Sequence, residues 1–200
     1  MTINAVSNQV IRNLVRELML SVGEDPNREG LLATPGRFTK AWSFWTSGYD
    51  QKPENVLTAF TEDGAGEYDE LIFQGNIVCF SLCEHHLAPF FGVAHVGYLP
   101  NGKIIGLSKM ARLVEIFSRR LTIQERICTQ IADTMMDHLD CRGVGVVLQC
   151  RHLCMESRGV QKPGTITVTS ALRGAIREHG ELRAEFMTMV AAASTGLARP

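Results

Sequence analysis

Apolar positions near the start of the chain recur at the spacing of a helix. Val10, Leu14 and Leu18 fall on one helical face, and Gly23 followed by Pro26 interrupts the pattern. We therefore predict a first amphipathic helix that ends before Gly23.

A second helix is expected to begin at Thr34, because a residue that favours the N-cap is followed by Pro35 at the first helical position. Phe38 and Trp42 continue its apolar face, and Gly48 is expected to end it. The first part of the chain is therefore interpreted as helical.

A polar, turn-rich stretch follows at residues 61–69, where Gly64 and Gly66 favour turns. We interpret it as a surface loop and as the main boundary in the chain. The predicted parts are an N-terminal helical region at residues 1–66, a main domain at 67–193 and a disordered tail at 194–200.

Beyond that loop the pattern changes to runs rich in apolar and β-branched residues, which favour strands. Strands are expected at residues 71–80, 92–99, 103–107, 143–155 and 165–169, the last with alternating threonines. Pro100-Asn101-Gly102 predicts a hairpin turn that joins the second of these strands to the third.

Helical spacing returns between the strands. Ser108 can cap an amphipathic stretch that ends near Leu121 and resumes after Thr122 as far as Leu139, and a last helix is expected at residues 181–193. Strands before, between and after a pair of helices predict an α+β fold, with helices on one face of an antiparallel sheet.

Composition narrows the class of protein. The 200 residues are 45% hydrophobic and 20% charged, and the formal net charge of −1 provides no global positive field for nucleic acid or anionic lipid. No apolar run is long enough to span a bilayer, and the N-terminus lacks the pattern of a secretory signal. We expect a cytoplasmic protein with reduced thiols and with no nucleic-acid or membrane partner.

The densest group of candidate metal ligands follows two predicted strands. Cys83 and His86 are three residues apart, so both can face one ion where the chain turns. Alternation along the later strand places Cys150, His152 and Cys154 on one face. Two thiolates and one imidazole suit zinc, and three protein ligands leave a fourth position for water, as in catalytic zinc sites.

Two further histidines lie beside these ligands. His85 and His152 are candidates for proton transfer, because imidazole titrates near neutral pH. A rival arrangement uses the matching spacing of Cys79 with Cys83 and of Cys150 with Cys154 to form a closed, structural four-thiol site. The histidines favour the open site, since a closed tetrathiolate leaves them without a role. Cys128 and Cys141 are expected to be buried thiols.

Six motifs in order closely resemble the GTP cyclohydrolase I family, and the resemblance extends over nearly the whole chain. They are Cys83-Glu84-His85-His86-Leu87, Tyr98-Leu99-Pro100-Asn101-Gly102-Lys103, Ile105-Gly106-Leu107-Ser108-Lys109, Ser118-Arg119-Arg120-Leu121, Gln124-Glu125-Arg126 and His152-Leu153-Cys154-Met155. Gly23-Glu24-Asp25-Pro26 near the start and Glu185-Phe186 near the end extend it.

The resemblance implies a catalytic domain with a tunnelling fold. It implies a homodecamer with active sites at subunit interfaces and one zinc ion per subunit, held by Cys83, His86 and Cys154. The implied reaction is hydrolytic: GTP and water give formate and 7,8-dihydroneopterin triphosphate, the first step toward folate or other tetrahydropterins. Zinc-bound hydroxide would attack C8 of the guanine ring, His85 and His152 would shuttle protons, and Ser108 would assist the later rearrangement.

Substrate contacts are implied by the same resemblance. Glu125 offers two acceptors for the N1–H and 2-amino donors of guanine, a pair that adenine does not present. Gln124 would lie in the same pocket, and Arg37 would reach the triphosphate from a neighbouring subunit. The other cations at triphosphate positions are Lys109, Arg112 and Arg158, and guanidinium groups bind phosphate in a bidentate fork.

One departure from the family and two alternative functions remain. Glu156 places a negative charge near the expected triphosphate site. Another enzyme of the same fold, such as a nitrile-reducing enzyme of the queuosine pathway, would use a lone nucleophilic cysteine and a nicotinamide cofactor. A non-catalytic, zinc-stabilised oligomer acting as a binding module would be expected to lack part of the ligand set, which is complete here.

Overall fold

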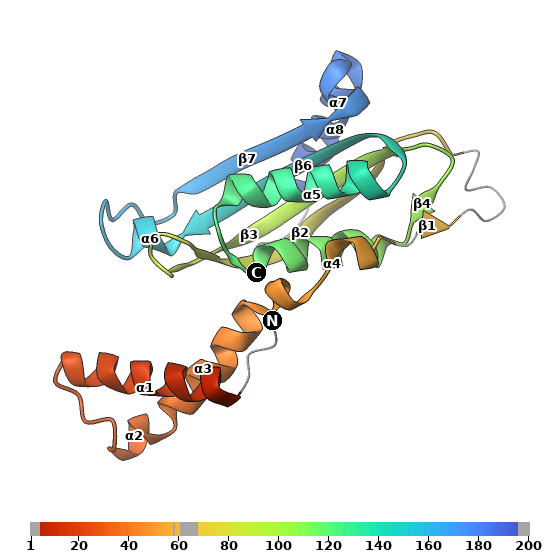
Figure 1. The fold of residues 1–200 in the computed structure, drawn as a ribbon. Coiled ribbons are helices and arrows are strands. Elements are labelled where there is room, and N and C mark those ends of the chain that lie inside the picture. The colour runs from red at the N-terminus through yellow and green to blue at the C-terminus, as the bar shows by residue number, and fades with distance from the viewer. Residues whose placement is uncertain (1–4, 58, 61–67, 196–200) are drawn as a thin grey trace.

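A five-stranded sheet forms the centre of the molecule (Figure 1). The computed structural model describes residues 5–57, 59–60 and 68–195. The strand order is β5-β2-β3-β6-β7, and every pairing is antiparallel except that of β5 with β2. The strands are β2 (Ile72–Cys83), β3 (Pro89–Pro100), β5 (Leu121–Thr122), β6 (Cys141–His152) and β7 (Ile166–Arg173).

Two amphipathic helices cover one face of this sheet (Figure 1). They are α4 (Leu107–Ser118) and α5 (Gln124–His138), which place Leu113 and Ile127 against the sheet side chains Val96 and Val146. All four of these side chains are fully buried, and this layer forms the main hydrophobic core. The predicted α+β fold, with paired helices on one face of an antiparallel sheet, is confirmed.

The last helix packs on the opposite face of the sheet. After α7 (Gly174–Glu178), α8 (Gly180–Thr195) inserts the fully buried ring of Phe186 over Gly97 and Gly145. A Cβ at Gly145 would lie 2.8 Å from that ring, so these two strand positions need glycine to admit it. The helix leaves the rest of this face uncovered, where Val78 and Phe80 are exposed.

The N-terminal helices extend away from the sheet, as Figure 1 shows. A short turn after them, η1, holds this region against α4: Gly48 donates its N–H to the carbonyl of Arg119 at 3.0 Å. A Cβ on Gly48 would lie 2.1 Å from the carbonyl oxygen of Ile116, so only glycine permits this approach. The elements are α1 (Ala5–Ser21), α2 (Glu29–Leu32), α3 (Thr34–Trp45), η1 (Ser47–Asp50) and η2 (Pro53–Asn55).

The prediction of a hairpin at residues 100–102 is wrong. The chain beyond it forms β4 (Ile104–Ile105), which pairs with β1 (Ala59–Phe60) and not with β3. The physical reason is that both edges of β3 are already occupied, by β2 and by β6, over nearly the full length of the strand.

Helix ends also differ in detail from the sequence prediction. Ser108 is the second residue of α4 and the N-cap is Gly106, because the chain is already helical at Leu107. Likewise Thr34 begins α3 without a side-chain cap, and the helix ends at Trp45. The last helix continues two residues beyond its predicted end.

The division into three parts stays a prediction. Most of the loop that contains its first boundary (residues 61–67) and the end of the predicted tail (196–200) lie outside the described residues. Among the residues that the structure describes, no helix is both long and apolar enough to cross a membrane.

A buried histidine beneath α8 makes stability depend on pH. His95 is fully buried on β3, where it stacks on Phe73, and its Nε2 has no partner among the described residues. Burial lowers the pKa of His95 below that of an exposed imidazole. As the pH falls below about 6.5, the unfolded chain therefore binds a proton that the folded chain resists, and the free energy of unfolding decreases.

We expect His95→Gln to weaken this acid dependence. Urea unfolding at about pH 7.5 and about pH 5.5 should show a larger decrease in the free energy of unfolding for the wild type than for the variant. Equal decreases in the two proteins would show that His95 is not the responsible group.

Candidate functional site

A tight turn between β2 and β3 positions the first two candidate ligands. Cys83 ends β2, and its carbonyl accepts hydrogen bonds from the N–H groups of His86 (3.3 Å) and Leu87 (2.8 Å). Leu87 has a φ of 53°, a left-handed conformation that is uncommon for a bulky residue and lets the chain reverse here. The turn brings His86 back over Cys83, with 3.7 Å between Nδ1 and Sγ.

The third candidate ligand follows the end of β6. The strand ends at His152, and Cys154 lies in the short helix α6 (Leu153–Glu156) that follows. Strand alternation was therefore the wrong reason for grouping Cys154 with Cys150. The thiol of Cys150 lies in the core, whereas that of Cys154 turns toward Cys83 and His86.

The three side chains fit one metal ion. The ligand atoms of Cys83, His86 and Cys154 lie within 4.8 Å of one another. In a tetrahedral zinc site, bonds of about 2.0–2.3 Å place neighbouring ligand atoms roughly 3.5 Å apart. Burial and the adjacent Cys83 thiol raise the pKa of Cys154, so the two thiols ionise together most readily beside a cation. The group can hold a metal ion, and its two sulfurs and one nitrogen suit zinc.

The four-thiol alternative does not form. Cys79 and Cys150 meet in the core with 3.8 Å between their sulfurs, on either side of Gly92 of β3. Along β2, Cys79 is four strand positions, or about 13 Å, from the ligand candidate Cys83. In the described part of the chain, Cys83, His86 and Cys154 are the one group of three or more His, Cys, Asp or Glu side chains suited to a metal.

The remaining two cysteines are buried core thiols, as predicted. Burial raises the pKa of both Cys128 and Cys141 to about 11, which keeps them protonated and unreactive at neutral pH.

Gln124 and Phe90 hold His152 in one orientation. The amide nitrogen of Gln124 donates to the carbonyls of Leu148 and Thr167, both at 3.0 Å. Its oxygen must therefore face His152, whose Nε2 lies 2.8 Å away and carries the proton of that hydrogen bond. Phe90 is the cross-strand partner of His152 and stacks on its ring at 4.7 Å. Nδ1 of a neutral His152 is then free to accept a proton.

The electrostatic surroundings of His152 keep it neutral at pH 7. Burial lowers its pKa, and the carboxylates of Glu125 and Glu156 oppose that effect only in part. Glu125 itself is exposed on the first turn of α5.

These groups surround one small pocket with a volume of about 170 Å³. Small-molecule sites usually measure about 300–1,000 Å³, so this pocket can enclose part of a nucleotide but not all of it. The structure thus brings together the three candidate ligands, both predicted proton-transfer histidines, Gln124 and Glu125. The lining residues are Cys83, His85, His86, Phe90, Thr122, Ile123, Gln124, Glu125, His152 and Cys154.

Arg158 lies at the rim of this group, with Nη1 2.9 Å from Nε2 of His86. The nearby Glu156 is held by Arg151 through two contacts of 2.9 and 2.5 Å, which lower the pKa of the carboxyl group. Arg151 therefore balances the charge of Glu156, the acid that departs from the family pattern.

Three predicted site residues lie at the other end of the sheet. Ser108, Lys109 and Arg112 occupy the first half of α4 and do not line the small pocket. The N–H of Ile105, just before this helix, donates to the hydroxyl of Tyr98 at 3.0 Å. Tyr98 is nine strand positions, or about 30 Å, from the turn that carries the ligands. Arg37 lies on α3 in the N-terminal region, so a single chain does not assemble these four residues with the others.

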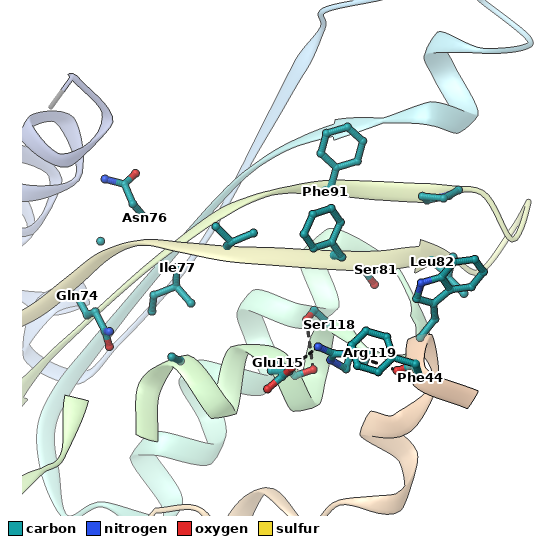
Figure 2. Close-up of a pocket in the computed structure, with 16 residues that line it drawn as sticks. Phe44, Gln74, Asn76, Ile77, Ser81, Leu82, Phe91, Glu115, Ser118 and Arg119 are labelled. Carbon is teal, nitrogen blue, oxygen red and sulfur yellow. Dashed lines mark hydrogen bonds and ion pairs between the residues drawn. The ribbon is translucent and has the colours of Figure 1, made fainter. Parts of the chain in front are cut away.

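A larger hollow of about 820 Å³ runs along the outer edge of β2 (Figure 2). Phe44 and Arg119 lie on one side of it and Phe91 on the other. It contains none of the candidate ligands, so it is separate from the metal group.

Comparisons with known proteins agree with the motif resemblance. A family model described as GTP cyclohydrolase I matches residues 11–191. A GTP cyclohydrolase 1 from Janthinobacterium sp. (strain Marseille) is 56% identical over 174 residues, which are 87% of this chain and 87% of that protein. A GTP cyclohydrolase 1 from Streptomyces avermitilis is 50% identical over 193 residues, or 96% of this chain and 94% of the relative.

Two solved structures show more distant likeness. An archaeosine synthase (QueF-Like) in the apo form is 14% identical, with a TM-score of 0.44 over 54% of this chain and 97% of its own. A dihydroneopterin aldolase from Burkholderia thailendensis, bound to guanine, is 13% identical, with a TM-score of 0.40 over 56% of this chain and 95% of its own. Neither likeness is close enough to bear on the function of this chain.

Metal binding should depend on the thiol pair of Cys83 and Cys154 and not on that of Cys79 and Cys150. Titration with Co²⁺ should give about one ion per chain and sulfur-to-metal charge-transfer absorption. Cys154→Ser should weaken binding by at least about tenfold, whereas Cys150→Ser should bind as tightly as the wild type. Loss of binding in Cys150→Ser with retention in Cys154→Ser would contradict the assignment.

Proposed function

This chain belongs to the GTP cyclohydrolase I family, and we propose that it converts GTP and water to formate and 7,8-dihydroneopterin triphosphate. The observation that carries the proposal is the convergence of Cys83, His86 and Cys154 with His152 and Glu125 around one pocket. A metal site, a proton-transfer group and a purine-reading carboxylate are thereby within reach of one heterocycle.

The three candidate ligands are proposed to hold one zinc ion per subunit. When bound, zinc supplies a water molecule with its pKa lowered to about 7, and so a nucleophile at neutral pH. Support comes from the donor set, since two thiols and one imidazole leave a fourth position open.

Glu125 is proposed to select guanine. Its carboxylate lies on the exposed first turn of α5 and lines the same pocket as the ligands. The two oxygens can accept hydrogen bonds from N1–H and from the 2-amino group of guanine, whereas adenine lacks this donor pair. Gln124 contributes through His152, because both ends of its buried amide are already hydrogen-bonded.

His152 and His85 are proposed to move the protons. Opening the imidazole ring of guanine and releasing formate require proton transfer to the ring nitrogens and from the added water. Neutral His152, with Nδ1 unprotonated, can act as the base and later return the proton as an acid. His85 is exposed beside the candidate ligands, with Nδ1 3.9 Å from Sγ of Cys83, and is proposed as the second proton-transfer group.

The triphosphate and the sugar rearrangement are assigned to residues from more than one chain. Arg158 is near the metal group, but Ser108, Lys109 and Arg112 lie at the far end of the sheet. We therefore place these three, and Arg37, in the site of a neighbouring copy. There the cations would bind the triphosphate, and Ser108 would assist ring closure through the ribose carbons.

Unpaired strand edges and exposed apolar side chains support such an assembly. In the part of the chain that the structure describes, β2 pairs on its outer edge with only the two residues of β5, and β7 is the other edge of the sheet. Val78, Phe80 and Val168 are more than half exposed on the face that α8 leaves open. Joining sheet to sheet would cover these edges. We propose a closed homo-oligomer, a homodecamer by family resemblance.

The proposal includes a cytoplasmic location, because the ligand thiols need a compartment that keeps them reduced. The pterin product would then enter folate or other tetrahydropterin biosynthesis. A nitrile-reducing enzyme is not favoured, since the thiols of Cys83 and Cys154 are paired around one metal position. A non-catalytic binding module is not favoured either, because the proton-transfer histidines are positioned in the pocket.

Turnover of GTP tests the proposal. Zinc-loaded wild-type protein should release formate and form a pterin that fluoresces after oxidation. His152→Ala should lower kcat by about 10²–10⁴-fold, the usual contribution of a general acid–base group, and chelation of the metal should abolish activity. Absence of both products from protein with one zinc per chain would refute the function.

Mixing two defective variants tests the shared site. Ser108→Ala and His152→Ala chains, each alone, should form little pterin. An equal mixture co-expressed in one assembly should regain roughly a quarter of wild-type pterin formation, because about a quarter of the interfaces join the two intact halves. A mixture no more active than the single variants would place Ser108 in the site of its own chain.

A further inference from the structure

Glu84 lies inside the ligand turn, yet nothing in the proposed reaction uses it. Its two carboxylate oxygens contact the two terminal nitrogens of Arg126, one at 3.1 Å and the other more closely. The pair is a bidentate fork between residues 42 positions apart in the sequence.

This ion pair joins the two halves of the pocket. On one side, Glu84 lies between the ligand Cys83 and His85, and its N–H donates to the carbonyl of Thr122 at 3.1 Å. On the other side, Arg126 is in the first turn of α5, directly after Glu125. The pair therefore links the turn that carries the metal ligands to the turn that carries the purine-reading carboxylate.

The charges of the pair suit a positioning role. The guanidinium of Arg126 and the carboxylate of Glu84 balance each other's charge beside the pocket. The side chains of Glu84 and Arg126 are 29% and 44% exposed, and ion pairs so exposed contribute little to stability. A two-point fork nevertheless fixes both distance and direction. Oε1 of Glu84 is also 4.0 Å from Nε2 of His85, which extends the contact to a proton-transfer group.

We propose that Glu84 and Arg126 are positioning residues that hold the ligand turn at a fixed distance from the first turn of α5. The metal and the carboxylate of Glu125 then act on opposite parts of one purine ring. This inference rests on the proposed function, because it assigns Glu125 to the purine.

The test compares Glu84→Gln, Arg126→Gln, their double variant and Arg126→Lys in zinc-loaded protein with GTP. Each single glutamine variant should lower kcat by about 10–100-fold, the usual effect of residues that orient metal ligands, with a smaller change in KM. The double variant should be no worse than either single variant, because both remove the same interaction. Arg126→Lys should not restore kcat, since an ammonium group keeps the charge but lacks the fork.

Asp133→Asn is the matched control. Asp133 pairs with Arg173 at 2.7 Å, lies on the same helix and has similar exposure, with 29% for the arginine and 48% for the aspartate. Loss of this ion pair should leave kcat within about twofold of the wild-type value, as expected for a surface ion pair. Zinc content and unfolding temperature, measured for every variant, show whether each remains folded and loaded.

The outcomes distinguish failure of the positioning role from failure of the proposed activity on GTP. An active wild type with a fully active Glu84→Gln variant overturns the positioning role alone. The positioning role is also overturned if Arg126→Lys restores kcat or if Asp133→Asn lowers kcat as much as the glutamine variants do. It is overturned as well if loss of zinc accounts for the whole decrease in kcat. A zinc-loaded wild type that does not act on GTP overturns the proposed function and this inference together.

Discussion

The register of β3 between β2 and β6 is the constraint on which the site depends. Leu82 pairs with Pro89 at the end of one ladder, and Phe90 pairs with His152 at the end of the next. These pairings bring the last residues of β2 and of β6 to the same end of the sheet, where Cys83 and Cys154 then meet. A slip of one residue would turn every side chain of a strand to the opposite face and separate the ligands.

The same register also explains the core beneath the site. Gly92 lies between Cys79 and Cys150, and a Cβ there would be 1.9 Å from the carbonyl oxygen of Gln149. Without a side chain at this position, two strands that are not neighbours bring their thiols into contact. The core thiols and the candidate ligand thiols are thus two separate pairs, and among the described residues only the pair at the end of the sheet belongs to a group that could hold a metal ion.

Parts of this arrangement could be predicted from the sequence because they depend on local spacing. A separation of three residues at a turn was sufficient to place His86 near Cys83, and helical periodicity was sufficient to find the two helices over the sheet. Cys154 was grouped correctly but for a wrong reason, because strand alternation stops where β6 ends. The prediction of a hairpin after Pro100 failed because a hairpin needs a free edge on β3, and both edges are paired with other strands. The family resemblance predicted Gln124 only as a pocket residue, and the distant carbonyls of Leu148 and Thr167, which accept from its amide, show that it is a buried support for His152.

We propose that the metal has three protein ligands, two of them sulfur, and an open position. X-ray absorption at the zinc edge of the loaded protein measures this directly. We expect two sulfur neighbours at about 2.3 Å and two nitrogen or oxygen neighbours at about 2.0–2.1 Å. Four sulfur neighbours at about 2.3 Å would instead show a closed structural site, without an open position for water.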